Sequence, residues 1–341
     1  MQPSAHPVLG FVTVAFSGMM TASFAAPMKL SRRWSWENTW LVYATLALVL
    51  IPGALIVWSI PHPLTFYTSL SPRQLLLPLL FGFGWGIAQV TFGLSIVRVG
   101  MAMAFAIVIG LSSLLGSAIP LAVFHPEDLL GRVGIALFVS AILLAVGLVL
   151  FAKAGREREL LSGNKSTAKQ AFRLGILLCI FTGCFGSMIN MGFVFGSGIA
   201  QQATANGVSP QKATLAVWFV VLGAGYIPNL FFTLYLLKKN GTWNRFVQSS
   251  GREMLLALAA AVLWLFGMLG YGVGASIMGK FGNSIGFAVC MAALLLWSSA
   301  LGEMTGEWRA APPSTLRCMR IGLGFIMLAV ITLGFGSLFR S

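Results

Sequence analysis

Long apolar runs separated by short polar segments make up almost the whole of this sequence. A run of about 20 apolar residues is long enough to cross the hydrocarbon core of a membrane as an α-helix. Runs of this kind cover residues 6–28, 39–60, 74–97, 101–124, 131–152, 174–197, 213–237, 253–274, 281–302 and 318–338. The pattern therefore predicts an all-α polytopic membrane protein with ten transmembrane helices.

The composition agrees with this pattern. Hydrophobic residues make up 57% of the 341 residues and charged residues only 9%, whereas soluble domains carry about 25% charged residues. So few charges cannot cover a water-exposed surface, and the excess of apolar side chains must therefore face lipid. The composition excludes both a soluble domain and a disordered chain.

The basic residues indicate how the chain is oriented. The formal charge of +14 comes from 22 lysines and arginines set against 8 acids. When the loops are assigned alternately to two sides, seventeen of these 22 basic residues fall on one side. Positive residues mark the cytoplasmic side, so we expect both termini outside a bacterial-type inner membrane. Because the charges are spread among separate loops, no nucleic-acid partner is expected.

The longest polar stretch, residues 153–173, separates two groups of five predicted helices. We interpret residues 1–152 and 174–341 as two repeats joined by a cytoplasmic connector. Because each repeat has an odd number of spans, the second must be inverted relative to the first. A trace of similarity supports duplication: Phe16-Ser17-Gly18 in the first span resembles Phe181-Thr182-Gly183 in the sixth.

Residue types that carry catalysis or bind metal are scarce and scattered. The four cysteines lie in or beside apolar runs without a C-x-x-C pair, and the three histidines are far apart in sequence. The glycine-rich stretch from Gly82 to Gly86 lies inside an apolar run, as do the pairs Gly192/Gly196, Gly270/Gly274 and Gly282/Gly286. We interpret this small-xxx-small spacing as helix packing. We expect no enzyme activity, no metal and no cofactor.

Uncharged polar residues inside the spans are the best candidates for a site. They are Gln89, Asn190 and Asn229, with Gln201-Gln202 just beyond the sixth span. An amide in hydrocarbon must find a partner. That partner is either a neighbouring helix or a neutral ligand, and the sequence leaves both interpretations open.

Aromatic residues near these amides favour a sugar ligand. Trp85 precedes Gln89 by one helical turn, and Tyr226 lies three residues before Asn229, so each pair shares a helix face. An aromatic ring beside an amide suits a sugar, which presents both an apolar ring face and hydroxyl groups. Two more aromatic residues on the eighth span, Trp264 and Tyr271, are predicted to add to this site. The tryptophans nearer the span ends are interpreted as membrane-interface anchors: Trp34, Trp36, Trp40, Trp243 and Trp308.

Glu37, at the start of the second span, is the best acid for proton coupling. An exposed carboxylate is ionised at neutral pH, so a carrier that binds a proton there must bury it. The alternative is a salt bridge with Arg32 or Arg33. In the seventh span, Pro228 and the preceding glycines predict a broken or moving helix, with a passive kink as the alternative.

With these residues in view, the chain resembles the L-rhamnose/proton symporter family of the drug/metabolite transporter superfamily. The most specific pieces are Phe24-Ala25-Ala26-Pro27, Trp34-Ser35-Trp36-Glu37, Phe81-Gly82-Phe83-Gly84-Trp85-Gly86-Ile87, Phe92-Gly93-Leu94, Gly100-Met101-Ala102-Met103, Asn190 and Glu307-Trp308. The resemblance implies ten spans in two inverted five-helix repeats and proton-driven import of a deoxyhexose. In one respect the chain departs from the family: members carry an acidic residue in the ninth span, where Asn283-Ser284-Ile285-Gly286-Phe287 is neutral here.

The leading hypothesis is a secondary transporter that imports a neutral sugar, L-rhamnose or a relative, by proton symport through a central cavity. One alternative is an exporter of metabolites or drugs from the same superfamily, although a cationic drug would want an intramembrane carboxylate. Another is a sugar facilitator without coupling. A lipid flippase or membrane scaffold is the fourth. The expected partners are a sugar, a proton and membrane lipid.

Overall fold

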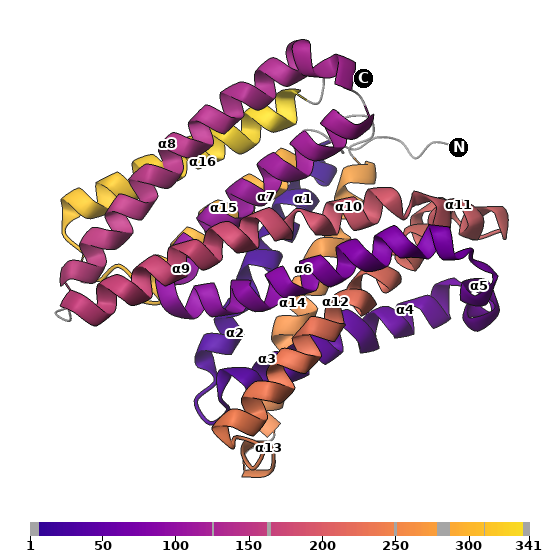
Figure 1. Cartoon of the computed structure of the whole chain (residues 1–341), viewed down its shortest axis with the longest axis horizontal. Helices are drawn as coiled ribbons and strands as arrows, with labels where there is room; N and C mark the ends of the chain where they lie inside the picture. Colours follow the sequence, from indigo (N-terminus) through magenta and orange to yellow (C-terminus); the bar gives the residue numbers. More distant parts are fainter. Residues whose placement is uncertain are drawn as a thin grey trace. The chain divides into compact units, whose positions relative to one another are not determined.

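The computed structural model describes residues 7–124, 126–161, 165–248, 251–277, 287–309 and 311–336, all of them helical or in loops (Figure 1). The elements of the first half are α1 Pro7–Ser23, α2 Ala25–Leu30, α3 Trp36–Thr45, the π-helical turn η1 Leu46–Leu50, α4 Ile51–Ser59, α5 Pro63–Ser69, α6 Pro72–Val99, α7 Met101–Phe124, the 3-10 turn η2 Pro126–Leu130 and α8 Arg132–Leu161. Those of the second half are α9 Lys165–Gly186, α10 Met188–Phe195, α11 Ser197–Ala205, α12 Pro210–Asn240, α13 Arg245–Gln248, α14 Gly251–Ile277, α15 Phe287–Met304 and α16 Pro313–Gly336.

The predicted spans correspond to helices in the structure. Among the described residues, 8 helical stretches are long and apolar enough to cross a membrane. Two shorter apolar helices, Met101–Gly116 and Val289–Met304, fall at the predicted fourth and ninth spans. The all-helical polytopic membrane fold is therefore confirmed. Residues 281–286 of the ninth span, with the Gly282/Gly286 pair, lie outside the described residues.

Several helix boundaries differ from those expected. Helix α8 continues to Leu161 and α9 begins at Lys165, so much of the polar connector is helical. The sixth span is divided into α9, α10 and α11 at Ser187 and Gly196. The seventh span is not broken, because α12 runs through Pro228 as one helix of 31 residues. A movement or a kink at Pro228 stays a prediction.

The chain divides into two compact units, and each combines segments from both halves of the sequence. Unit 1 consists of residues 1–26, 91–184 and 263–341, and unit 2 of residues 27–90 and 185–262. The chain passes from one unit to the other four times, after Ala26, Val90, Cys184 and Val262. These points fall in the first and third predicted spans of each half.

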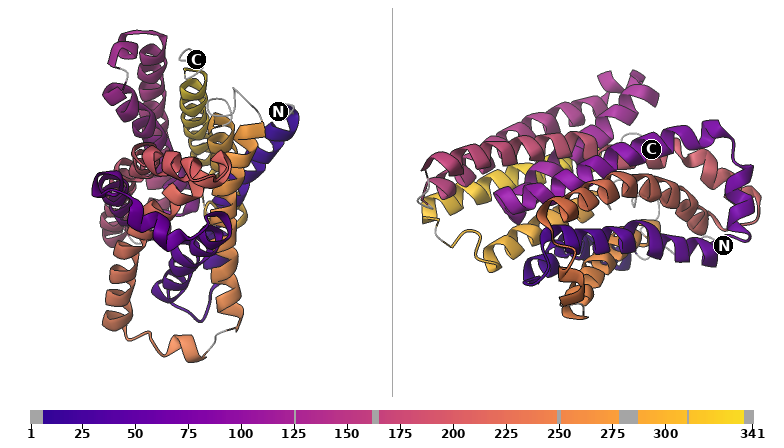
Figure 2. Two further views of the ribbon diagram at one scale, coloured as in Figure 1. Left: turned by 90° about the vertical axis from the view of Figure 1, so that its right-hand side faces the viewer. Right: turned by 60° about the horizontal axis from the view of Figure 1, so that its bottom comes forward.

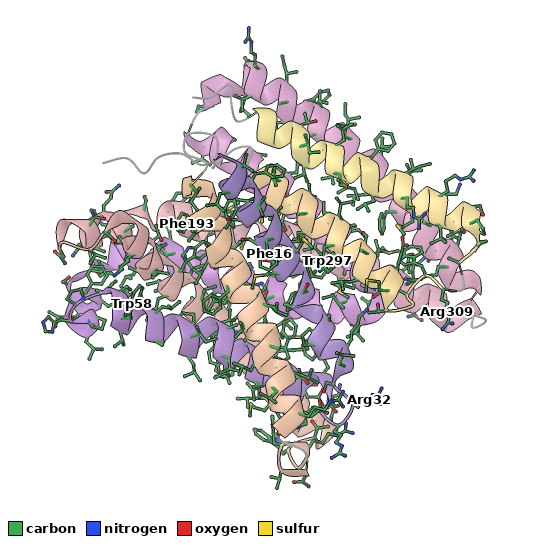
Figure 3. The ribbon with its side chains drawn as sticks, turned by 180° about the vertical axis from the view of Figure 1, so that it is seen from behind. Phe16, Arg32, Trp58, Phe193, Trp297 and Arg309 are labelled. Atoms are coloured by element: carbon green, nitrogen blue, oxygen red, sulfur yellow. The ribbon has the colours of Figure 1, made fainter. Side chains whose placement is uncertain are left out.

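Unit 1 is built from pairs of long helices. Helices α8 and α16 run side by side, as do α1 and α15 (Figures 1 and 2). At Gly18 of α1, an added Cβ would lie 2.3 Å from the carbonyl oxygen of Cys290 on α15. Near the other end of α1, Trp297 Nε1 of α15 donates to Ser23 Oγ at 2.7 Å (Figure 3). Close helix packing through small residues therefore organises this unit.

Unit 2 is organised around α12, which packs against α3, η1, α4, α10 and α11. Its backbone also comes close to that of α6: a Cβ added at Gly86 would lie 2.2 Å from the Gly225 oxygen. The packing interpretation is confirmed for Gly82 and Gly86 here. It is confirmed as well for the pairs Gly192/Gly196 and Gly270/Gly274, whose added Cβ atoms would all meet neighbouring atoms within 3.0 Å.

Candidate functional site

A fully buried amide joins three helices at the centre of unit 2. Asn229 of α12 is 0% exposed, and its Oδ1 accepts a hydrogen bond from Trp40 Nε1 of α3 at 2.7 Å. Its Nδ2 donates to the Gly86 oxygen of α6 at 3.2 Å and to the Gly225 oxygen at 2.8 Å. Both amide groups are thus bonded to protein, and the side chain holds α3, α6 and α12 together.

Gln89 lies one turn after Gly86 on α6. Like Asn229 it bonds to α3, but to a tyrosine and not to Trp40. It is buried, and its Nε2 donates to Tyr43 OH at 3.0 Å. The rings of Tyr43 and Trp40 lie 5.2 Å apart. The two predicted amides, Gln89 and Asn229, are therefore connected through aromatic side chains of α3.

The two aromatic residues predicted beside these amides also lie in this region. Trp85 is buried against the backbone of α12, where a Cβ added at Gly225 would be 2.7 Å from its Cε3 atom. The half-buried Tyr226 has its hydroxyl 2.9 Å from Thr45 Oγ1, and either oxygen could be the donor. Trp85, Gln89, Tyr226 and Asn229 are thus brought together by the contacts of α3, α6 and α12.

Asn190 lies on α10, a short helix next to α12. It is half-buried, and within the described residues its side chain has no recorded hydrogen bond. Its neighbours are packed tightly: Gly192 against Val221 of α12, and Met188 against Gly84 of α6. Helix α10 therefore contacts both helices that carry the amide cluster, although no hydrogen bond joins Asn190 to Gln89 in the described part of the chain.

Trp264 and Tyr271 belong to unit 1. Trp264 is buried, and Tyr271 packs against the small cluster of Val14 and Cys290. The other predicted residues belong to unit 2. A sugar contact by Trp264 or Tyr271 stays a prediction.

Glu37 lies in the first turn of α3 and is only 4% exposed. Its Oε1 accepts from Thr242 Oγ1 at 2.8 Å and from Asn240 Nδ2 at 3.0 Å. Asn240 is the last residue of α12, and Thr242 lies just after the helix. The residue after Glu37, Asn38, donates from Nδ2 to the Thr242 oxygen at 3.0 Å. Its Oδ1 has no partner among the described residues. The recorded hydrogen-bond donors to Glu37 are therefore neutral groups.

Sequence reasoning missed the importance of α3. Trp40 was expected at the membrane interface, but this is wrong, because its side chain is 1% exposed and bonded to Asn229. Trp34 and Trp308 are buried inside the protein in the same way. Tyr43 was not predicted at all. The three-residue spacing of Glu37, Trp40 and Tyr43, which puts them on neighbouring positions of one helix, was the signal that could have found it.

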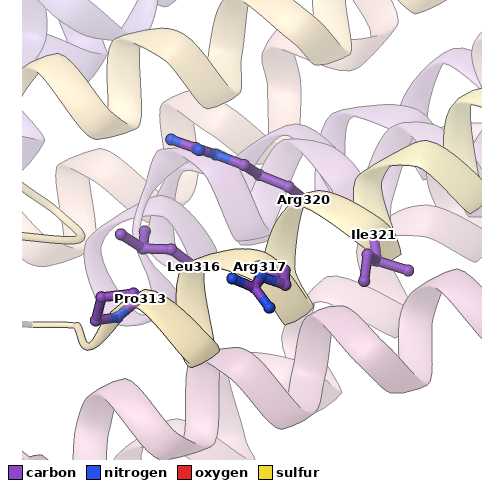
Figure 4. Close-up of a pocket in the computed structure, with 5 residues that line it drawn as sticks. All are labelled: Pro313, Leu316, Arg317, Arg320 and Ile321. Atoms are coloured by element: carbon purple, nitrogen blue, oxygen red, sulfur yellow. The ribbon is translucent and has the colours of Figure 1, made fainter.

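A surface hollow elsewhere in the molecule contains none of the predicted residues. Pro313, Leu316, Arg317, Arg320 and Ile321 line it on the first turns of α16 (Figure 4). Arg320 there pairs with Glu303 at 3.0 Å, with both side chains well exposed. This hollow is therefore a charged surface at the start of a helix, separate from the predicted site residues.

The structure shows a polytopic helical membrane protein with a buried cluster of uncharged polar and aromatic side chains. The model of the L-rhamnose-proton symport protein (RhaT) family matches residues 4–338, and the chain belongs to this family. It is 26% identical over 325 residues to the L-rhamnose-proton symporter of Shigella dysenteriae serotype 1, with 92% of this chain and 94% of that protein covered. The L-rhamnose-proton symporters of Escherichia coli O1:K1 / APEC and of strain 55989 match with the same identity and coverage.

Proposed function

We propose that this protein imports L-rhamnose or a closely related deoxyhexose together with a proton. The family match, which spans residues 4–338, carries this proposal. The neutral character of the buried cluster supports it, because amides and aromatic rings suit an uncharged polyol. An exporter of cationic drugs from the same superfamily would instead be expected to carry a carboxylate within the cluster.

The proposed sugar site is centred on Gln89, with Trp85 and Tyr226 as the aromatic side chains next to it and Asn190 approaching on α10. Gln89 and Asn190 are the amides best suited to exchange a partner for a sugar hydroxyl. Asn229 already uses its groups on Trp40, Gly86 and Gly225. In this proposal Asn229 therefore acts mainly by holding the helices of the site in position.

The function is tested with purified protein and a panel of sugars. A ligand that binds only the folded protein raises its melting temperature by mass action. We expect stabilisation by L-rhamnose to exceed that by mannose, glucose or amino acids, and we expect L-rhamnose to alkalinise the outside of protein-containing vesicles. Stabilisation by an amino acid or a cationic drug instead would favour the exporter alternative. Rhamnose uptake without proton movement would favour the facilitator.

We further propose that the two halves are inverted repeats. The exchange points between the units support this, because they fall in the first and third spans of residues 1–152 and again of residues 174–341. In such an arrangement, alternating access arises largely from rocking of one repeat or bundle against the other around the binding site.

Both termini are proposed to lie outside, with residues 153–173 in the cytoplasm, because of the charge asymmetry. Single thiols introduced at Ser162 and at Ser71, in a background without the four native cysteines, test this. An impermeant thiol reagent added to intact cells should label the protein with Ser71→Cys and spare the protein with Ser162→Cys. The opposite pattern would invert the topology.

Glu37 is the proposed proton-binding group. Its buried side chain lies on the same helix as Trp40 and Tyr43, which bond to Asn229 and Gln89, and this position supports the role. Glu37→Gln should abolish uphill sugar uptake but leave counterflow exchange, which needs no net proton movement. If proton-driven uptake persists in Glu37→Gln, another group carries the proton.

A further inference from the structure

Helix α3 carries one row of buried side chains that connects the proposed proton site to the proposed sugar site. Glu37, Trp40 and Tyr43 are 4%, 1% and 0% exposed. Their three-residue spacing places them on successive turns of a ten-residue helix. A displacement of α3 therefore moves all three side chains together.

These side chains are bonded to two neighbouring elements, α12 with the segment after it, and α6. Glu37 accepts from Asn240 and Thr242, at the end of α12 and just after it. Trp40 donates to Asn229 within α12. Tyr43 OH accepts from Gln89 of α6. The row thus reaches from the end of α12 to the amide that we assign to the sugar.

Both ends of α3 are irregular, which permits a movement of this short helix. Residues 31–35 before it are non-helical, and the π-helical turn Leu46–Leu50 follows it, close to Pro52. A π-turn inserts one extra residue into a helix and is frequent at functional sites. Conversion of that turn to α-helical geometry would rotate α3 by about 100° and shift it by about 1.5 Å.

We propose that Tyr43 is a positioning residue that couples the protonation of Glu37 to sugar binding at Gln89. This inference rests on the proposed function. In the structure, the Glu37 carboxylate accepts two hydrogen bonds, and the Tyr43 hydroxyl accepts the hydrogen bond that the Gln89 amide donates. Protonation of Glu37 weakens the two bonds because a neutral acid is a poorer acceptor than a carboxylate. Helix α3 then moves, Tyr43 leaves Gln89, and the Gln89 Nε2 group becomes available to a sugar hydroxyl.

Other charged residues lie on the segments that flank Glu37 in the chain or pack near its end of α3, and they must be considered in any pH measurement. They are Arg32 and Arg33 before α3, Lys238 and Lys239 at the end of α12, Arg245 on α13, and Arg252 and Glu253 at the start of α14. Two of these charged groups have hydrogen bonds of their own: Glu253 Oε1 accepts from the Arg33 backbone N–H at 3.4 Å, and Arg252 Nη2 donates to the Leu30 oxygen at 3.4 Å. Glu37→Gln separates the contribution of Glu37 from theirs.

The experiment is to measure the Kd of L-rhamnose in the full-length protein across the whole pH range over which it stays folded. Because coupling is reciprocal, a linked proton should tighten sugar binding as the pH falls, by up to about tenfold per pH unit. Tyr43→Phe removes the hydroxyl that competes for Gln89. We expect it to bind rhamnose with a nearly pH-independent Kd, to keep counterflow and to lose uphill uptake.

Tyr67→Phe is the matched control. Tyr67 is a tyrosine of unit 2 that, unlike Tyr43, is only half-buried, and its hydroxyl donates to the Ala216 oxygen at 3.2 Å. Burial raises the pKa of Tyr67, so its hydroxyl does not titrate in the range of the experiment. This variant should keep the pH slope of the wild type, whereas Glu37→Gln should lose it.

The possible results separate the two proposals. If wild-type protein does not bind rhamnose at any pH, the proposed function fails. If it binds rhamnose but Tyr43→Phe retains the full pH slope, or if the wild type has no slope, the coupling role of Tyr43 is overturned. If Tyr43→Phe does not fold, Trp40→Phe tests the same row: it should reduce the pH slope, and an unchanged slope would contradict the inference.

Discussion

The two units of this protein differ in the polar side chains that they bury. Among the described residues, the buried polar residues of unit 1 are serines and threonines, a few of which bond between helices, as Thr182 does with Thr91 at 2.7 Å, whereas unit 2 also buries amides. In unit 1, many serine and threonine hydroxyls bond to their own helix, as Ser17 does to the Thr13 oxygen at 2.7 Å and Ser140 to the Ala136 oxygen at 2.7 Å. In unit 2, amides bond between helices: Asn229 joins α12 to α3 and α6, and Gln89 joins α6 to α3. A bond within one helix places no constraint on the neighbouring helix, whereas an amide bond between helices determines which residues of the two helices meet.

This difference suggests a division of roles between the units. A hydroxyl bonded within its own helix is satisfied wherever that helix goes, so it suits a scaffold. A buried amide that loses its partner is costly in hydrocarbon, so it is retained where a specific arrangement or a ligand needs it. The helices of unit 2 are therefore the better place for a sugar site. The predictions below test this comparison.

The largest expected effect comes from the glycines at helix contacts, and it should be the same in both units. An added Cβ would lie 2.3 Å from a backbone oxygen at Gly18 and 2.2 Å from one at Gly86. Overpacking against backbone costs about 1–3 kcal/mol or more. We expect Gly18→Ala and Gly86→Ala to lower the melting temperature of the purified protein strongly, with loss of folded yield.

Gly272 in unit 1 and Gly223 in unit 2 are the matched controls, because an added Cβ would meet nothing within 4 Å at either position. Alanine is the better helix former. Gly272→Ala and Gly223→Ala should therefore melt at or slightly above the wild-type temperature. Equal melting of Gly86→Ala and Gly223→Ala would mean that α6 and α12 are not in close contact.

The second prediction concerns stability and should distinguish the units. Asn229→Ala leaves Trp40 Nε1 and the Gly86 oxygen without their bonds, and each unpaired buried group costs about 1–3 kcal/mol. Ser140→Ala removes a hydroxyl that is bonded to its own helix and should destabilise the protein less than Asn229→Ala, because the Ala136 oxygen keeps its backbone bond within the helix. Thermal unfolding in detergent measures both. A similar melting temperature for the two variants would remove the contrast between the units.

The third prediction concerns affinity. Losing one buried hydrogen bond to a sugar hydroxyl costs about 1–3 kcal/mol, so Gln89→Ala and Asn190→Ala should each weaken rhamnose binding by about 5- to 150-fold. Ser17→Ala in unit 1 should leave the affinity unchanged. Titration of well-folded variants checks this. If Gln89→Ala binds rhamnose normally, its amide serves only to hold Tyr43.

Much of this architecture could be predicted from the sequence because lipid imposes a strong pattern. The apolar runs located the spans, and the small-residue spacing of Gly82 and Gly86 predicted a close helix contact. The unbroken course of α12 could not be predicted. Pro228 removes only the backbone bond to the oxygen of Ala224, and the packing of α12 against its neighbouring helices keeps the rest of the helix intact.

The site could be predicted only in part, because the sequence of one span does not show which residues of other helices its side chains will bond to. Amides inside apolar runs stand out in the sequence, and Gln89 and Asn229 do lie in one cluster. Their partners, Trp40 and Tyr43, are aromatic residues that resemble ordinary core or interface residues until the structure places them. The division of the chain into two units was equally invisible, because it cuts helices such as α6 between Val90 and Thr91.

The smallest expected effect distinguishes a sugar contact from packing at Tyr226. Its hydroxyl and Thr45 Oγ1 lie 2.9 Å apart and are half-buried, so breaking this bond should cost only about 0.5–1.5 kcal/mol of stability. Tyr226→Phe and Thr45→Val each break it, but only Tyr226→Phe also removes a hydroxyl that could reach the sugar. If Tyr226 contacts rhamnose, Tyr226→Phe should weaken binding several-fold, whereas Thr45→Val should lower the melting temperature by a similar amount and leave the Kd near that of the wild type. Equal Kd values for the two variants and the wild type would assign Tyr226 to helix packing, and the sugar site would then be confined to the residues around Gln89.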